Sequence, residues 1–322
     1  MNIRKLQQTG GKNGSSFLII LPKKWVETRK LGKGDSVVIT EREDGCLIID
    51  PRLQRTGGTR STSIPIESNL RWSITSKYLL GFDEIKVIAT KQITNAQRDE
   101  LKGIIKRFVA LEVTDETDHQ IVVQCLVDPA ILPVGKAMRR MNLIASRMLG
   151  DAMDAFLQGS REIAEDVIER DEEVDRMFFL TVRELRSAIQ YPSISEAMGL
   201  TPVAALDFRL AVQYLERIAD LAVEIAERTD GPVDKKIAKK LEPIATQVKE
   251  MLTTSVSNLF KFDAEKVGWV IKAEKDLIKD IAKIRQDIIS TSDAQPQLHV
   301  IDSLLRIGEA AKDITDLALP EN

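Results

Sequence analysis

The feature that most restricts the fold of this 322-residue chain is a series of six long helical patterns after about residue 130. Apolar residues recur there at the three- and four-residue spacing of an amphipathic helix, and short breaks of Gly, Pro, Ser or Asp separate the patterns. Long helices with short connections predict helical bundles. We expect helices over 133–158, 161–190, 201–229, 235–262, 264–291 and 297–319.

The six patterns form two sets of three. Val167–Asp175 in the second pattern can be overlaid on Val270–Ile278 in the fifth, and Leu215–Asp220 in the third on Leu304–Glu309 in the sixth. This internal repeat predicts a three-helix bundle that is present twice. The two bundles are expected over residues 130–231 and 232–322.

The first fifty residues have a different pattern, in which short β-branched runs alternate with turn residues. We expect strands near Lys5–Gln8 and Phe17–Leu21, with a helix after Pro22. A hairpin is expected at Asp44 and Gly45, because this pair favours the positive φ of a two-residue turn. Such a β-β-α-β-β unit is too short to bury much surface alone, so we expect it to dimerise.

The residues between these two parts follow a polar linker over 51–63 and predict the order β-α-β-α-β-β. We interpret this order as a small α/β domain of ferredoxin-like type, with a spacer or dimerisation role. Thr94 is expected to cap the second helix, Trp72 to anchor the core and His119 to lie in a loop. The predicted fold is therefore a multidomain α+β chain. Its domains are expected over 1–52, 53–129 and 130–322.

Charge is distributed unevenly along the chain. Residues 1–40 carry eight Lys or Arg and two Asp or Glu, whereas residues 151–230 carry eight Arg, no Lys and 18 Asp or Glu. A basic end suits a polyanion such as nucleic acid, and an acidic block suits cations or a basic partner. The alternative interpretation is that these charges only form solvated faces.

The composition argues against several other classes of protein. Cys46 and Cys125 form no CxxC pair, which argues against a disulfide framework or a zinc ribbon. Only two histidines are present, so most hydrolytic schemes lack their usual base and we expect no enzyme activity. No apolar run is long enough to span a membrane, and the start has no apolar signal region. We therefore expect a cytoplasmic protein without membrane insertion.

Three stretches of the first part resemble the SpoVT/AbrB family of swapped-hairpin DNA-binding modules: Arg4–Gly11, Leu21–Trp25 and Leu31–Val37. The resemblance implies a homodimer in which two chains interleave their hairpins into one β-barrel that binds double-stranded DNA. Neutralised phosphates release counterions, and this release dominates non-specific affinity. The candidate DNA-binding residues are Arg4, Lys5, Lys12, Lys23 and Lys24. The alternative is that these charges only keep a small barrel soluble.

Two pairs of carboxylates are the main candidate site in the helical part. Asp171 and Asp175 lie four residues apart and share a helix face, as do Glu216 and Asp220. Apolar residues bracket both pairs, so partial desolvation would be costly unless a cation or a donor compensates. Oxygen donors of this kind suit Mg, Ca, Mn or iron. The alternative is an exposed acidic face with arginine partners, such as Arg170, Arg176 and Arg217.

The paired three-helix repeats and their acid pairs resemble the PhoU family of phosphate signalling. The resemblance implies that Asp171, Asp175, Glu216 and Asp220 bind a divalent metal or iron in the first repeat. In the second repeat Ile278 and Leu305 replace two of the four acids, which leaves Glu274 and Glu309. An apolar side chain cannot ligate a hard cation, so a reduced or absent second site is expected. The methionines of the first pattern are expected to fill the core: Met138, Met141, Met148 and Met153.

The two resemblances together favour a phosphate-responsive transcription regulator. In this reading the N-terminal dimer binds operator DNA and the helical part is a sensor or adaptor. A second reading is an adaptor that acts on a phosphate transporter or its sensor kinase without binding DNA. A metal-dependent hydrolase and an antitoxin are weaker readings, because no nucleophile is evident and some 270 residues follow the first module.

Overall fold

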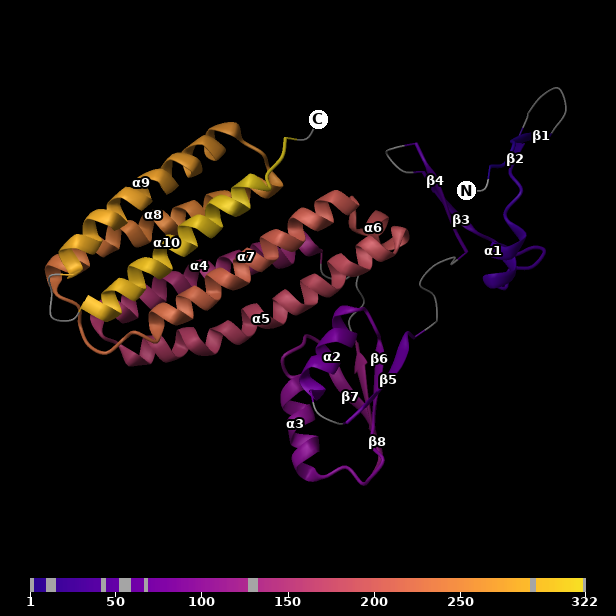
Figure 1. The fold of residues 1–322 in the computed structure, drawn as a ribbon, viewed down its shortest axis with the longest axis horizontal. Coiled ribbons are helices and arrows are strands. Elements are labelled where there is room, and N and C mark those ends of the chain that lie inside the picture. Colours follow the sequence, from indigo (N-terminus) through magenta and orange to yellow (C-terminus); the bar gives the residue numbers. More distant parts are fainter. Residues whose placement is uncertain are drawn as a thin grey trace. The chain divides into compact units, whose positions relative to one another are not determined.

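The computed structural model describes residues 3–9, 16–41, 45–51, 59–66, 69–126, 133–289 and 294–320. The chain divides into two compact units, Met1–Gly58 and Thr59–Asn322 (Figure 1). The expected linker over 51–63 lies largely outside the described residues, as do Lys12 and Asp44. Within the described ranges, no helix is both long enough and apolar enough to cross a membrane.

The N-terminal unit has the predicted order β-β-α-β-β. Strand β1 (Gln7–Thr9) pairs antiparallel with β2 (Ser16–Leu18), helix α1 (Lys23–Thr28) follows Pro22, and β3 (Val38–Glu41) pairs antiparallel with β4 (Leu47–Asp50). Gly45 has a φ of 76°, as the predicted turn requires. The two hairpins form separate two-stranded sheets, so the closed barrel is not confirmed.

The described part of this unit has no apolar core. Many of its large apolar side chains are exposed, including Phe17 and Leu47 at 64% each and Ile20 at 60%. Among its described residues, no apolar side chain is buried. Because burial of apolar area is the main favourable term in folding, a stable form of this unit requires another surface that covers these side chains.

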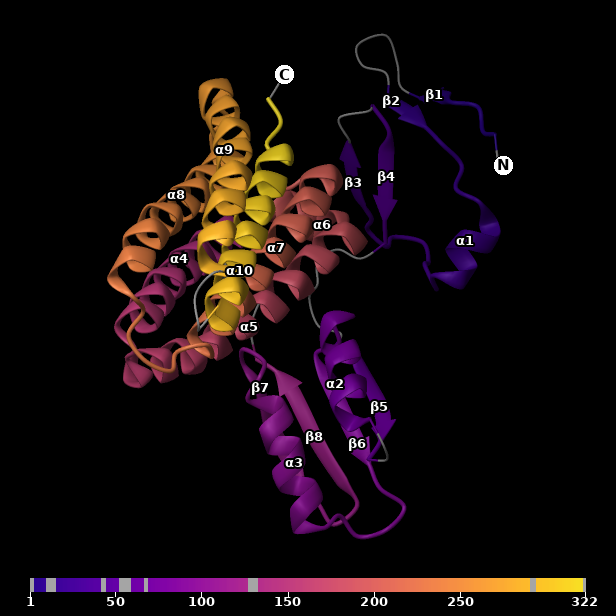
Figure 2. The ribbon, with the colours of Figure 1, turned by 60° about the vertical axis from the view of Figure 1, so that its left-hand side comes forward.

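The α/β domain begins the second unit and has the predicted order β-α-β-α-β-β. Its elements are β5 (Ser61–Pro65), α2 (Leu70–Leu79), β6 (Glu84–Ile88), α3 (Asn95–Ile105), β7 (Leu111–Glu116) and β8 (Gln120–Cys125). The sheet has the order β5-β6-β8-β7, with β5 and β6 parallel and the other pairs antiparallel. Both helices lie on one face of the sheet (Figure 2). A ferredoxin-like fold has the order β-α-β-β-α-β, so that part of the prediction is not confirmed.

Helix α2 also corrects the expectation for Trp72. The buried residues of α2 are Leu70, Ile74 and Tyr78, which are spaced four apart on one stripe. Trp72 lies two residues from Leu70 and Ile74, on the opposite side of the helix, and is 72% exposed. Thr94 caps α3 as predicted, because its side chain accepts a hydrogen bond from the backbone N–H of Gln97.

The helical part contains the six predicted long helices within the described residues. They are α4 (Val134–Gln158), α5 (Arg161–Gln190), α7 (Pro202–Ala226), α8 (Lys235–Phe260), α9 (Ala264–Ile289) and α10 (Ala294–Asp316). Helices α4, α5 and α7 pack together, as do α8, α9 and α10, and one apolar core runs through both repeats. The short helix α6 (Pro192–Met198) was not predicted. Pro192, which we read only as a break, occupies the first turn of this helix, where proline is tolerated.

Glycine at two predicted breaks brings the ends of the first repeat together. Gly159 ends α4 with a φ of 72°, and a Cβ atom placed there would lie 2.4 Å from the carbonyl carbon of Gly231. The backbone N–H of Val233 donates to the carbonyl of Leu157 over 3.1 Å, which closes the same corner. The four methionines expected in the core are all at most 3% exposed.

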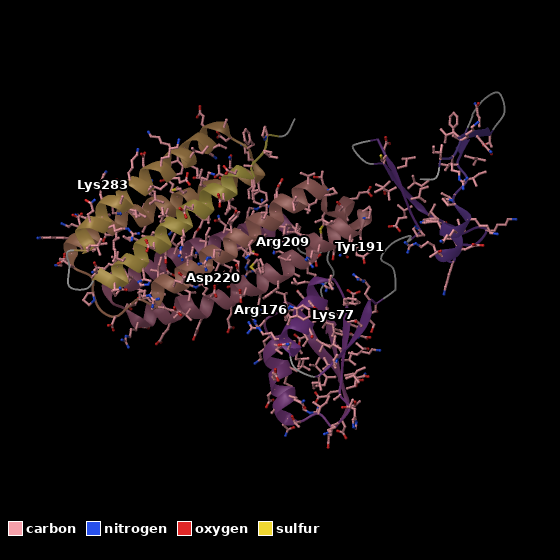
Figure 3. All side chains as sticks on the ribbon, viewed as in Figure 1. Lys77, Arg176, Tyr191, Arg209, Asp220 and Lys283 are labelled. Atoms are coloured by element: carbon pink, nitrogen blue, oxygen red, sulfur yellow. The ribbon has the colours of Figure 1, made fainter. Side chains whose placement is uncertain are left out.

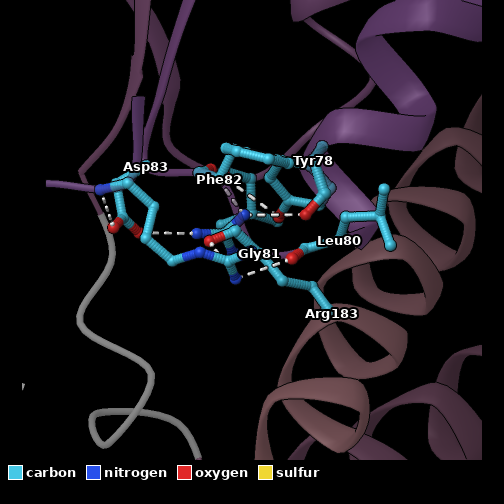
Figure 4. Close-up of polar contacts among 8 residues, drawn as sticks. Tyr78, Leu80, Gly81, Phe82, Asp83 and Arg183 are labelled. Carbon is cyan, nitrogen blue, oxygen red and sulfur yellow. Dashed lines mark hydrogen bonds and ion pairs between the residues drawn. The ribbon is translucent and has the colours of Figure 1, made fainter. Parts of the chain in front are cut away.

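A buried arginine joins the α/β domain to the first repeat. Arg183 on α5 is 1% exposed, and its Nη1 atom donates to the carbonyls of Tyr78 and Phe82 over 2.7 and 2.8 Å (Figure 4). Its Nη2 atom lies 3.0 Å from Oδ1 of Asp83. These carbonyls lie at the C-terminal end of α2, where the free carbonyls and the helix dipole favour a cation.

A second arginine completes the capping of α2. Arg60 donates from Nη1 to the carbonyl of Leu80 over 2.9 Å, and its backbone N–H donates to Oδ2 of Asp83 over 3.0 Å. The two arginines therefore bond to different carboxylate oxygens of Asp83. Aromatic packing continues the contact, because the ring of Phe108 lies 4.7 Å from that of Tyr78 and 5.1 Å from that of Phe179 on α5.

Removal of the Arg183 side chain should loosen the α/β domain from α5. Arg183→Ala leaves the carbonyl of Phe82 without its donor, removes one of the two donors to the carbonyl of Tyr78 and takes the paired cation from Asp83, so we expect the free energy of unfolding to fall by roughly 3 kcal/mol. Urea denaturation gives this value, and hydrogen exchange at the end of α2 should accelerate. Arg186→Ala is the matched control, because Arg186 is exposed on the same helix. Equal stability of the two variants would contradict the assigned role.

Candidate functional sites: an acidic cluster and a basic hairpin unit

The four predicted acids lie on two adjacent helices of the first repeat. Asp171 and Asp175 belong to α5, and Glu216 and Asp220 belong to α7, which packs against α5. Figure 3 labels Asp220. The neighbouring residues Val174 and Ala219 are fully buried. The 3.6-residue period therefore places each acid pair at the edge of a buried apolar stripe, as the sequence predicts. We call these four residues the acidic cluster.

The carboxylates of the acidic cluster affect one another across the two helices. Burial raises the pKa of Asp171 to about 6, and repulsion from Asp175 and Asp220 adds to the effect. Burial likewise raises the pKa of Glu216 to about 7, with further repulsion from Asp220 and Asp175. Burial also raises the pKa of Asp220, although the nearby Arg217 opposes the shift. The cluster thus concentrates negative charge in a partly desolvated place, where a cation is favoured.

Three of the four acids already have polar partners. Nη2 of Arg107 in the α/β domain lies 3.2 Å from Oδ2 of Asp175. Arg217 lies 3.6 Å from Asp220 on the same helix. The side-chain amide of Gln213 donates to Glu216 over 2.8 Å.

These separate partners explain why the carboxylates do not converge. Across the described ranges, no three His, Cys, Asp or Glu side chains are placed to hold one metal ion. The donor set is nevertheless of the right chemistry, since all four side chains offer carboxylate oxygens, which hard cations prefer. The residues present therefore fit a cation chemically, and in this structure Asp175 and Asp220 are engaged in ion pairs with arginines.

The arginine partners differ in part from the expected ones. Arg170 pairs with Asp151 of α4 over 2.5 Å and does not serve the acidic cluster. Arg176 is exposed, and Arg217 pairs with both Asp220 and Glu224. Sequence reasoning missed Arg107, because no local pattern links it to a residue 68 positions further on.

The second repeat lacks two of the four acids of the first repeat, as the sequence overlay shows. The overlay puts Ile278 of α9 in the place of Asp175, and Ile278 is 46% exposed. It also puts Leu305 of α10 in the place of Glu216. Glu274 and Glu309 remain, one on each helix, without the second acid of either pair. The acidic cluster of the first repeat is therefore the stronger candidate for a cation site.

The described basic residues of the N-terminal unit are all exposed. Arg4 and Lys5 precede β1, and Lys23 and Lys24 begin α1, where Lys23 lies 3.7 Å from Glu27 one turn later. Lys12, the fifth candidate, lies outside the described residues. The side chains are thus accessible to a polyanion, and the geometry by itself identifies no groove for one.

Comparisons with known proteins match a region in each of the two units. Residues 138–229 match the PhoU domain, and residues 12–57 match the domain described as "Antidote-toxin recognition MazE, bacterial antitoxin". The phosphate-specific transport system accessory protein PhoU homolog of Clostridium acetobutylicum is 25% identical over 160 residues, which covers 47% of this chain and 69% of that protein.

A solved PhoU structure supports the helical fold. The crystal structure of PhoU from Pseudomonas aeruginosa is 20% identical with a TM-score of 0.50, and the match covers 57% of this chain and 93% of that one. PhoU from Streptococcus pneumoniae, a phosphate transport system regulatory protein, is 14% identical with a TM-score of 0.49 over 57% and 91%. The fold is thus a tandem three-helix bundle of PhoU type preceded by a strand-rich unit. The chain thus contains a PhoU domain and, ahead of it, a domain of the MazE/AbrB type.

The raised pKa values of the acidic cluster predict how stability depends on pH. Asp171 and Glu216 bind protons more tightly in the folded than in the unfolded chain. Their ionisation therefore lowers the free energy of unfolding, with no loss below about pH 4 and the full loss above about pH 7. In chelator-treated buffer, Glu216→Gln should therefore stabilise the protein at pH 8, by at most about 1 kcal/mol for a partly solvated group. This gain should shrink as the pH falls toward 5.

Thermal or urea unfolding at several pH values measures this difference. Glu227→Gln is the control, because Glu227 is an exposed acid at the end of the same helix. A Glu216→Gln variant that is less stable than the parent at pH 8, or a gain that does not change with pH, would contradict the expectation.

Proposed function

We propose that this protein is a phosphate-responsive transcription regulator. It binds operator DNA through its N-terminal unit and senses or relays phosphate status through its helical part. The observation that carries the proposal is the presence of both domains in one chain, a basic unit that matches MazE-type antitoxins and a PhoU domain. The relative from Clostridium acetobutylicum is named for phosphate-specific transport, which supports the phosphate connection.

The exposed apolar residues of the N-terminal unit support a homodimer. Two copies of this unit would cover side chains such as Phe17, Ile20 and Leu47, which are at least 60% exposed in one chain. The hairpins of two chains would then share one core, in the interleaved barrel that the AbrB resemblance implies. A second copy of the chain is therefore the partner we assign to this surface.

Dimerisation would also double the positive charge of the unit. The proposed DNA-binding residues are Arg4, Lys5, Lys12, Lys23 and Lys24. In the dimer each of them would be present twice on one body, and counterion release from the phosphates would supply sequence-independent affinity. Specificity would have to come from contacts with base edges or from DNA shape, for which the sequence provides no assignment.

The helical part is proposed to act as a sensor or adaptor and not as an enzyme. The alternative function is an adaptor that acts on a phosphate transporter or a sensor kinase without using DNA, and the name of the Clostridium relative favours it. The two functions differ in what the basic unit does. Binding to promoter DNA therefore separates them.

A divalent metal or iron is proposed to bind the acidic cluster. Asp171 and Asp175 would hold it from α5, and Glu216 and Asp220 from α7. The bound ion would offset the burial and the mutual repulsion that together raise the pKa of Asp171 and Glu216. Arg107, Arg217 and Gln213 would have to release their carboxylates for this to happen.

Genome-wide mapping of bound DNA, in phosphate-rich and phosphate-starved cells, tests the proposed function. We expect enrichment at phosphate-transport operons that changes with phosphate supply. On an enriched duplex, Lys23→Ala/Lys24→Ala should weaken binding across sequences and reduce the salt slope, by roughly one per lost phosphate contact.

The matched control for this variant is Lys235→Ala/Lys236→Ala. That pair also begins a helix, α8, and its loss changes the net charge equally. Binding that is equally weakened by both double variants, or mapping that shows no enrichment at transport operons, would overturn the regulator and favour the adaptor.

A further inference from the structure

Arg107 connects the α/β domain to the acidic cluster. It lies just beyond the end of α3, and its Nη2 atom is 3.2 Å from Oδ2 of Asp175. Both side chains are largely covered, at 31% and 27% exposure. The guanidinium carbon also lies 5.7 Å from the ring centroid of Phe179 on α5. The α/β domain thus supplies the guanidinium that pairs with Asp175 of the acidic cluster in the helical part.

The backbone around Arg107 fixes the position of its side chain. The N–H of Arg107 donates to the carbonyl of Ile104, and that of Phe108 donates to the carbonyl of Ile105. Phe108 is 3% exposed, and its ring packs between those of Tyr78 and Phe179. Arg107 therefore sits on a packed corner of the α/β domain. We call residues 104–108 the Arg107 corner.

A cation bound at the acidic cluster would meet this arginine. A divalent ion held by Asp175 would share the carboxylate that now pairs with Arg107, and the two positive charges would repel each other at short range. The contact between the Arg107 corner and α5 has therefore an electrostatic part that a bound ion removes. Arg183 is 1% exposed at the other end of the contact, and its bonds to the end of α2 do not involve the cluster.

We propose that Arg107 is an internal counter-cation that competes with a divalent ion for the acidic cluster. Binding of the ion releases the Arg107 corner from α5, while Arg183 keeps the end of α2 in place. The α/β domain then pivots or loosens on one side only. Since this domain directly follows the DNA-binding unit in the sequence, the exchange links the cluster to the N-terminal half of the chain. The inference rests on the metal site proposed above and assigns its regulation.

Titration of the full-length, chelator-treated protein with Mn²⁺ tests the competition. Arg107→Met keeps an aliphatic stem against Phe179 and removes the charge, and it should bind Mn²⁺ roughly three- to tenfold more tightly than the parent, as expected for loss of a partly exposed ion pair. Lys106→Ala is the control, because it removes the same charge one residue away from an exposed side chain. It should leave the affinity unchanged.

Hydrogen exchange supplies a second readout that does not depend on a variant. Saturating Mn²⁺ should accelerate exchange of the Arg107 and Phe108 amides in the parent protein, and it should not do so in Asp171→Asn/Asp175→Asn. Exchange at the Arg183-bound end of α2 should stay slow in all cases. Circular dichroism establishes that each variant is folded.

The possible results separate this inference from the metal proposal. Mn²⁺ affinity that is equal or weaker in Arg107→Met, with binding still abolished by Asp171→Asn/Asp175→Asn, overturns the competition and leaves the metal site standing. The absence of Mn²⁺ binding in both the parent and Arg107→Met overturns the metal site and the competition together. Tighter Mn²⁺ binding in Arg107→Met, with unchanged affinity in Lys106→Ala, supports both the metal site and the competition.

Discussion

The buried guanidinium of Arg183 is the interaction on which the second unit depends. Transfer of a charge out of water is expensive, and an arginine at 1% exposure is tolerated only because its donors meet matched acceptors. Those acceptors are carbonyls at the end of α2 and the carboxylate of Asp83, all from the α/β domain. Both partners would carry unsatisfied polar groups if they separated. The α/β domain and α5 therefore behave as one body at this point.

Helix α5 carries both this junction and the acidic cluster. Asp175 precedes Arg183 by eight residues, a rise of about 12 Å along a helix. A change at the cluster thus occurs on the same rigid element that holds the α/β domain, and Arg107 of that domain pairs with the same element at Asp175. The described part of the N-terminal unit differs, because its apolar side chains are not gathered into a buried core. The second unit, by contrast, has two buried apolar cores of its own.

Much of the fold follows from local periodicity in the sequence. The 3.6-residue pattern predicted all six long helices, and the overlay of Val167–Asp175 on Val270–Ile278 predicted the two packed repeats. The same periodicity placed the four acids at the edges of buried stripes. The prediction that Trp72 anchors the core was wrong, because its size and apolar character were given more weight than its position around helix α2. Helix α6 was missed because its proline was read only as a break.

The partners of the candidate site could not be predicted in this way. Arg107 and Asp175 lie 68 residues apart on different domains, and their contact depends on how Phe108 packs between two aromatic rings. The burial of Arg183 could have been predicted, because this charged residue stands among the apolar positions of α5 and needs acceptors there. The acceptors are mostly backbone carbonyls, and because every residue has one, the sequence does not indicate which of them will accept.

The central proposal is that the acidic cluster and the N-terminal unit, to which we assign DNA binding, act on each other. By linkage, a cation that favours one arrangement of the chain must change its affinity for DNA. The most direct measurement is the affinity of the full-length protein for a phosphate-transport promoter duplex, by fluorescence anisotropy at constant ionic strength, with and without saturating Mn²⁺. The account predicts dissociation constants that differ by about fivefold or more. Equal constants under the two conditions would contradict it and leave two independent modules in one chain.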